Sequence, residues 1–212
     1  MIIKNSSTKT KEKPLNIPLG TLICLLFLIG IYLYMQILSG QNKIDFLINF
    51  SFIPAIYSDF STLRFYQIYS PLTYILLHGN FTHLIINLCM LSAFGSIIEK
   101  KFGILNLLYI FLFSSIIGVF SHYLIFQNSY SPVIGSSGGI CGLFSFYLIE
   151  KLIKNKNSNF KIIQTLIILI LIFYIFSLID IFPSINSSEI AWVVHIGGFI
   201  GGIFLFYIKK LY

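Results

Sequence analysis

Long apolar stretches alternate with short polar segments along most of the chain. A helix needs about 20 mostly apolar residues to cross a bilayer. The pattern predicts six such helices: Leu19–Leu38, Phe81–Ile98, Leu105–Phe126, Ser137–Ile149, Ile162–Ile179 and Glu189–Ile208. The first stretch is long and lacks a small-residue cleavage site, which argues against a cleaved signal peptide. The predicted fold is all-α: a polytopic membrane protein with a bundle of six transmembrane helices, the fourth of them unusually short.

The regions outside the predicted helices suggest a simple domain organisation. Residues 1–18 are polar and predict a disordered tail, and residues 19–212 predict one membrane domain. Residues 39–80 form one long loop that contains apolar runs such as Phe50–Ile56. We therefore expect this loop to lie partly in the lipid interface.

Composition excludes a soluble domain. Only 10% of the residues are charged and 57% are hydrophobic, with a mean hydropathy of +0.88, whereas soluble domains carry about 25% charged residues. The net charge of +7 would suggest nucleic acid in a soluble protein, but here membrane topology explains it and no nucleic-acid partner is expected. The three cysteines lie far apart in apolar stretches, so they predict neither a disulfide framework nor a metal site.

The basic residues predict the orientation. With six spans, both termini share one side, and that side holds twelve of the 14 basic residues: Lys4, Lys9, Lys11, Lys13, Lys100, Lys101, Lys151, Lys154, Lys156, Lys161, Lys209 and Lys210. Only Lys43 and Arg64 fall on the other side. Because basic residues are enriched in cytoplasmic loops, both termini are predicted to be cytoplasmic.

Polar residues of three predicted helices fall at one depth. Ser137, His195 and Asn87 each lie 13 or 14 residues before a lysine at the cytoplasmic end of their helix. At 1.5 Å per residue this is roughly 20 Å above the cytoplasmic edge, or about 10 Å below the outer face of a 30 Å core. His83 is one turn before Asn87 on the same face.

These side chains have the chemistry of acyl transfer. A serine hydroxyl is a weak nucleophile until a base accepts its proton, and histidine titrates near neutral pH. The intermediate then needs donors for its oxyanion, which His83, Asn87 and the Ser137 N–H could supply. Taken singly, each polar group is also compatible with interhelical hydrogen bonding that serves only packing.

Glycines surround the two central residues. A G-x-S-G sequence at residues 135–138 opens the predicted fourth helix, where glycine permits a tight entry and unpaired N–H groups favour negative charge. Gly138 and Gly142 form a small-xxx-small pair, as do Gly198 and Gly202 shortly after His195. Such pairs let helix backbones approach closely, which predicts close packing of the fourth and sixth helices.

Three motifs together resemble the rhomboid protease family over about Tyr69–Phe206. The first is Leu77–Asn87, similar to the family's LHG and H-x-x-x-N segment, followed by Phe94-Gly95 and Glu99–Gly103. The second is the G-x-S-G at residues 135–138. The third is the H-x-x-G-x-x-x-G at residues 195–202.

The resemblance implies a function and a role for each residue. Ser137 would be the nucleophile and His195 the general base and acid, in a dyad with no carboxylate. His83 and Asn87 would bind the oxyanion, and His78 would be structural. The resemblance also implies single-span membrane proteins as substrates, cut near the outer face of the lipid bilayer, and no cofactor or metal.

Two positions depart from the family pattern. Cys141 occupies the place of a tyrosine that packs on the catalytic histidine in many members, and Tyr69-Ser70 replaces a Trp-Arg pair in the external loop. An inactive relative that binds or escorts transmembrane clients is therefore an alternative. A small transporter would need paired broken helices and charges inside its spans, and the predicted span cores contain neither acidic nor basic residues apart from histidine. The chain is rich in Ile, Asn and Lys, which suggests an AT-rich bacterial genome, and its short core fits a bacterial plasma membrane.

Overall fold

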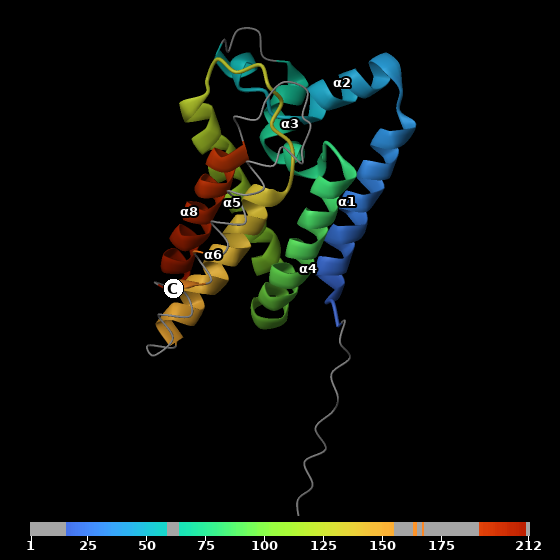
Figure 1. Cartoon of the computed structure of the whole chain (residues 1–212). Coiled ribbons are helices and arrows are strands. Elements are labelled where there is room, and N and C mark those ends of the chain that lie inside the picture. Colours follow the sequence, from blue (N-terminus) through green and yellow to red (C-terminus); the bar gives the residue numbers. More distant parts are fainter. Residues whose placement is uncertain (1–15, 59–63, 155–162, 165–166, 168–190, 211–212) are drawn as a thin grey trace, which may run out of the picture.

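The computed structural model describes residues 16–58, 64–154, 163–164, 167 and 191–210 (Figure 1). Its helices are α1 (Leu19–Ile37), α2 (Gly40–Phe50), η1 (Pro54–Ser58), α3 (Phe65–Thr73), η3 (Tyr74–Leu76), α4 (Phe81–Phe102), α5 (Ile104–Ile125), α6 (Ser137–Lys154) and α8 (Ala191–Lys210). The long helices run side by side, and α2 and α3 lie at one end of them (Figure 1). Within the described ranges, β pairing is limited to the isolated bridge between Phe52 and Val133.

Five of the six predicted spans coincide with described helices. α1, α4 and α5 are long and apolar enough to cross a membrane, and α8 contains a shorter apolar stretch, Trp192–Ile208. The predicted span Ile162–Ile179 lies almost entirely outside the described residues, as does most of the predicted tail. The all-helical architecture is confirmed for the described residues, and the count of six spans stays a prediction.

The fourth predicted span is longer as a helix than its apolar stretch suggested. We expected it to end at Ile149, but α6 continues to Lys154. The continuation brings the buried Glu150 carboxylate against the ammonium group of Lys101 on α4. An ion pair between helices thus stabilises the turn that hydropathy alone would have excluded.

Glycines allow α6 and α8 to touch through their backbones. A Cβ atom added to Gly198 would lie 2.0 Å from the carbonyl oxygen of Gly138, and one added to Gly202 would lie 2.1 Å from that of Gly142. No side chain fits at such separations. α5 packs against both helices, α4 packs against α6, and α1 packs against α4.

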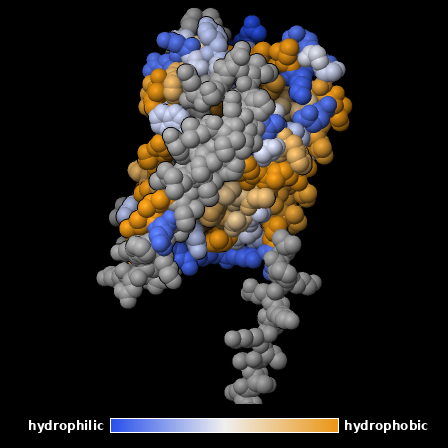
Figure 2. Space-filling model, in the orientation of Figure 1, coloured by the Kyte–Doolittle hydropathy of each residue, from blue (hydrophilic) through white to orange (hydrophobic). Residues whose placement is uncertain are grey.

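The surface is divided into zones. Figure 2 shows apolar side chains over the middle of the helices and hydrophilic ones gathered at the two ends. Large apolar side chains such as Leu26, Leu33 and Phe120 are more than half exposed. Such exposure would be unfavourable in water and suits contact with lipid chains.

A carboxylate of α4 caps the start of α1. The Glu99 side chain accepts hydrogen bonds from the backbone N–H of Gly20 at 2.8 Å and of Thr21 at 2.5 Å, and from the Thr21 hydroxyl at 2.7 Å. The first N–H groups of a helix have no partner within it, and its positive dipole end favours an anion. This contact ties the first span to the α4 end that is remote from α2.

Candidate active site

Ser137 is the first residue of α6 and is partly buried. The chain enters it through Gly135, whose φ of +116° is a conformation that residues with a side chain rarely adopt. The first helical hydrogen bond of α6 runs from the Ile140 N–H to the Ser136 carbonyl, at 3.1 Å. The Ser137 side chain therefore stands at a helix N-terminus, where unpaired N–H groups favour negative charge.

The structure brings Ser137 and His195 together across the contact of α6 and α8. The His195 Nε2 lies 2.7 Å from the Ser137 Oγ, although 58 residues separate them in the sequence. The close approach of Gly198 to Gly138 follows within one turn of each. With Nε2 unprotonated, the hydroxyl donates to it, which is the arrangement that activates a serine nucleophile.

His83 and Asn87 converge on the segment that precedes Ser137. A Cβ atom built on Gly135 would lie 2.7 Å from the His83 Nε2 and 3.9 Å from the Asn87 Nδ2. Asn80 caps α4 by accepting a hydrogen bond from the His83 N–H at 2.8 Å, which fixes the start of this helix. The Asn87 side chain is buried, and its Nδ2 has no hydrogen-bond partner among the described residues.

Comparison with known proteins decides the family. The sequence matches the Rhomboid domain family over residues 66–211. The chain belongs to the rhomboid family. Membership and the apolar helices together make it a multi-pass membrane protein.

Curated relatives of this rhomboid chain differ in their stated activity. The relative named "Putative rhomboid protease YdcA" of Bacillus subtilis (strain 168) is 32% identical over 137 residues, or 63% of each chain. Rhomboid protease GluP of the same organism is 34% identical over 138 residues, which are 63% of this chain and 24% of GluP. Inactive RHOMBOID-like protein 8 of Arabidopsis thaliana is 33% identical over 135 residues, which are 64% of this chain and 36% of that protein. The chain thus matches less than two thirds of each of these relatives, and the family includes both proteases and an inactive member.

His78 lies beside Ser136 and His83 at the site of this rhomboid chain, and its structural role stays a prediction. Its side chain is fully buried, and its Nε2 is 3.5 Å from the Ser136 Oγ. Its ring meets the His83 ring edge-on, with 5.1 Å between centroids. Burial, with a smaller effect from His83, lowers the pKa of His78 to about 3, so its imidazole is neutral at physiological pH.

Cys141 is buried one turn after Ser137. It stands where many rhomboid proteins have a tyrosine against the histidine, and its smaller side chain cannot supply the same ring contact. Among the described residues, no group of three or more His, Cys, Asp or Glu side chains could hold a metal ion.

Sequence reasoning missed Tyr74. Its side chain is fully buried, its hydroxyl donates to the Ser115 carbonyl at 2.8 Å, and its own carbonyl accepts from the Gly135 N–H at 2.9 Å. The residue lies three positions before the first family motif, which begins at Leu77, but nothing in the sequence shows that its polar groups reach α5 and the entry to α6. Only the fold reveals this placement.

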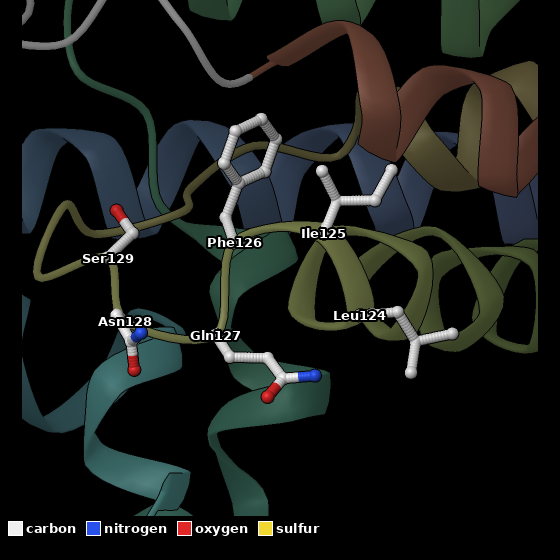
Figure 3. Close-up of a pocket in the computed structure, with 6 residues that line it drawn as sticks. All are labelled: Leu124, Ile125, Phe126, Gln127, Asn128 and Ser129. Carbon is white, nitrogen blue, oxygen red and sulfur yellow. The ribbon is translucent and has the colours of Figure 1, made fainter.

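An open pocket lies at the end of α5, with a volume of about 430 Å³. Residues Leu124–Ser129 line it (Figure 3). The loop that joins α5 to α6 contributes its first three residues, Gln127, Asn128 and Ser129, to this pocket. Neither Ser137 nor His195 lines it, so this pocket is separate from the candidate site.

Proposed function

We propose that the chain is an intramembrane serine endopeptidase in which Ser137 is the nucleophile and His195 the general base. The observation that carries the proposal is the 2.7 Å contact between the Ser137 Oγ and the His195 Nε2. Family membership supports the reaction class, because relatives such as GluP are named proteases.

The reaction then follows serine acyl transfer. The Ser137 Oγ attacks the carbonyl carbon of the scissile peptide bond while the His195 Nε2 takes the hydroxyl proton. The tetrahedral intermediate collapses as His195 returns this proton to the leaving amine, which yields an acyl-enzyme. Water attacks the ester, His195 accepts its proton, and the proton passes back to Ser137 as the new carboxylate leaves. The dyad needs no metal or cofactor for these steps.

The oxyanion of both intermediates would be bound by His83, Asn87 and the Ser137 N–H. The convergence of the His83 and Asn87 nitrogens beside Gly135 supports this role. The buried Asn87 Nδ2, without a partner among the described residues, is a donor available to substrate. Donors held in place before the reaction stabilise a developing negative charge more than mobile water does.

We propose single-span membrane proteins as the substrates, cut near the outer face of the bilayer. Both termini would be cytoplasmic, because twelve of the 14 basic residues fall on the side that the termini share. The Ile-, Asn- and Lys-rich usage supports a bacterial plasma membrane. A peptide bond inside a helix is protected by its own hydrogen bonds. Helix-breaking residues in the substrate should therefore favour cleavage.

The test incubates the purified protein in liposomes with a panel of single-span proteins and maps the cut sites. Ser137→Ala should reduce cleavage by more than about a thousandfold, because nucleophile and base act as one unit. It should also abolish labelling by a fluorophosphonate, which reacts only with an activated serine. The matched control is Ser136→Ala, which deletes the neighbouring hydroxyl and should leave both readouts largely intact.

The second candidate is an inactive rhomboid protein that binds or escorts transmembrane clients. The 33% identity with Inactive RHOMBOID-like protein 8 favours it, whereas the presence of both Ser137 and His195 argues against it. Two results together would favour this second candidate over the protease. The wild-type protein would neither cleave nor label with the fluorophosphonate, and Ser137→Ala would bind the client as well as the wild type does.

A further inference from the structure

Tyr74 lies near the end of the long loop of residues 39–80, shortly before α4 begins at Phe81. It is the first residue of η3, and its side chain has no exposed surface although it carries a polar hydroxyl. A buried hydroxyl requires a hydrogen-bond partner, which restricts where the ring can sit. The partners of this residue lie on α5 and in the segment that leads into α6.

The hydroxyl reaches the contact between α5 and α6. It donates to the Ser115 carbonyl of α5 at 2.8 Å. Ser115 in turn lies against α6, because a Cβ atom built on Gly139 would be only 2.4 Å from the Ser115 Oγ. The same Tyr74 hydroxyl oxygen would be 3.5 Å from a Cβ atom on Gly138, in ordinary van der Waals contact.

The backbone of Tyr74 holds the other side of the nucleophile. Its carbonyl accepts a hydrogen bond from the Gly135 N–H at 2.9 Å. Gly135 is the residue with φ of +116°, and His83 lies against it. The Tyr74 backbone therefore bonds to Gly135, at the entry to α6, and its phenol lies beside Gly138 in the first turn of α6. Ser137 lies between these two positions in the sequence.

We propose that Tyr74 is a positioning residue for Ser137. The hydroxyl anchors η3 to α5, so that the Tyr74 carbonyl holds Gly135 and thereby the direction of the Ser137 side chain and N–H. The inference rests on the proposed protease function. The Ser137–His195 contact and the oxyanion donors tolerate only small displacements, since a shift of about 1 Å can cost a hundredfold in rate.

The central variant is Tyr74→Phe, which keeps the ring and deletes the anchor. The Ser115 carbonyl has two lone pairs, and one of them accepts the hydrogen bond within α5. Loss of the Tyr74 hydroxyl therefore leaves this carbonyl with a hydrogen-bond partner. We expect kcat and the rate of fluorophosphonate labelling of Ser137 to fall roughly tenfold, the equivalent of about 1.4 kcal/mol in the barrier. KM should change by less than about twofold, because Tyr74 does not touch substrate.

The matched control is Tyr57→Phe. The Tyr57 hydroxyl donates to the Gln67 carbonyl at 2.7 Å and contacts the Ser70 hydroxyl, so it is another hydrogen-bonded phenol of the external loop. Among the residues that the structure describes, this hydroxyl makes no hydrogen bond to Gly135 or to α6. We expect Tyr57→Phe to lower the thermal unfolding temperature about as much as Tyr74→Phe while its labelling rate stays within about twofold of the wild type.

Replacement of Tyr74 by 4-aminophenylalanine provides a rescue, because its para N–H can donate to the Ser115 carbonyl. Labelling should return to within about threefold of wild type, and this variant also decides the matter if Tyr74→Phe does not fold. The inference would be overturned if Tyr74→Phe and Tyr57→Phe were labelled at equal rates. It would also be overturned if a Tyr74 variant without a donor at the para position kept the wild-type labelling rate. A wild-type protein that never labels would instead overturn the protease proposal itself.

Discussion

At the scale of single residues, Gly135 is the most constrained position beside the nucleophile. Its φ of +116° is strained for any L side chain, and a Cβ atom would lie 2.7 Å from the His83 ring. Gly135→Ala should therefore displace His83 or the entry to Ser137. We expect fluorophosphonate labelling to fall at least about tenfold, since a left-handed conformation alone costs a non-glycine residue roughly 1–2 kcal/mol.

Gly79→Ala is the control for this substitution. Gly79 lies near the same site but its φ is not in the left-handed region, and an added Cβ would meet only Ile134 at an ordinary 3.5 Å. Labelling and thermal unfolding of Gly79→Ala should remain close to wild type. If both variants label alike, the Gly135 conformation does not matter for the site.

The sequence was informative about residues that carry chemistry and silent about residues that hold them. Ser137 and His195 could be paired from depth and chemical type, and they lie 2.7 Å apart. Tyr74 could not be found in this way, because its bonds to Ser115 and Gly135 join segments 41 and 61 residues away. Periodicity reports which face of a helix is apolar, not which distant backbone group a buried phenol will meet.

At the scale of helices, the contact of α6 with α8 depends on glycine. Gly198→Ala places a methyl group 2.0 Å from the Gly138 carbonyl oxygen, so the two helices must separate. Because Ser137 and His195 sit on these helices, we expect labelling to fall by more than about a hundredfold. Thermal unfolding should also shift to lower temperature.

Gly30→Ala supplies the comparison for a helical glycine in open space. Gly30 lies within α1, and an added Cβ meets nothing within 4 Å. Labelling by Gly30→Ala should equal that of the wild type, and its helix should be no less stable, because alanine is the better helix former. A Gly198→Ala protein that behaves like Gly30→Ala would show that the contact tolerates a methyl group.

Helix ends were harder to predict than helix centres. The apolar stretch of α6 ends at Ile149, yet the helix runs on to Lys154 because Glu150 finds Lys101 on a neighbouring helix. α4 likewise extends past Ile98, where the Glu99 carboxylate bonds to α1. A prediction from hydropathy ends a span at a charged residue. In the folded protein the charge can pair with a group on a neighbouring helix, and its own helix then continues.

At the scale of the whole molecule, the charge asymmetry predicts an orientation that can be measured. In a protein whose three cysteines are replaced, Lys43→Cys on α2 should react with a membrane-impermeant maleimide in intact cells. Lys100 lies in the last turn of α4, and this end of the helix is remote from α2 (Figure 1), so Lys100→Cys should react only after the cells are opened. If Lys100→Cys reacted in intact cells and Lys43→Cys reacted only in opened cells, the proposed cytoplasmic location of the termini would be wrong.

Most of the architecture followed from hydropathy because a bilayer leaves the backbone few choices. Lipid offers no hydrogen bonds, so apolar stretches such as Phe81–Phe102 and Ile104–Ile125 must be helical. The arrangement of the loop between α1 and α4 did not follow in the same way. Its pairing of Phe52 with Val133 joins two irregular segments, and no periodic pattern encodes such a bridge.

The Glu99 contact with α1 has a consequence for how the protein is made. The carboxylate is synthesised 78 residues after Thr21, so the ribosome delivers the first helix long before its partner exists. Until then, water and lipid headgroups must bind the N–H groups of Gly20 and Thr21. Capping of the first helix by Glu99 is thus a late event in biogenesis, and a nascent chain that stops before residue 99 would lack this cap.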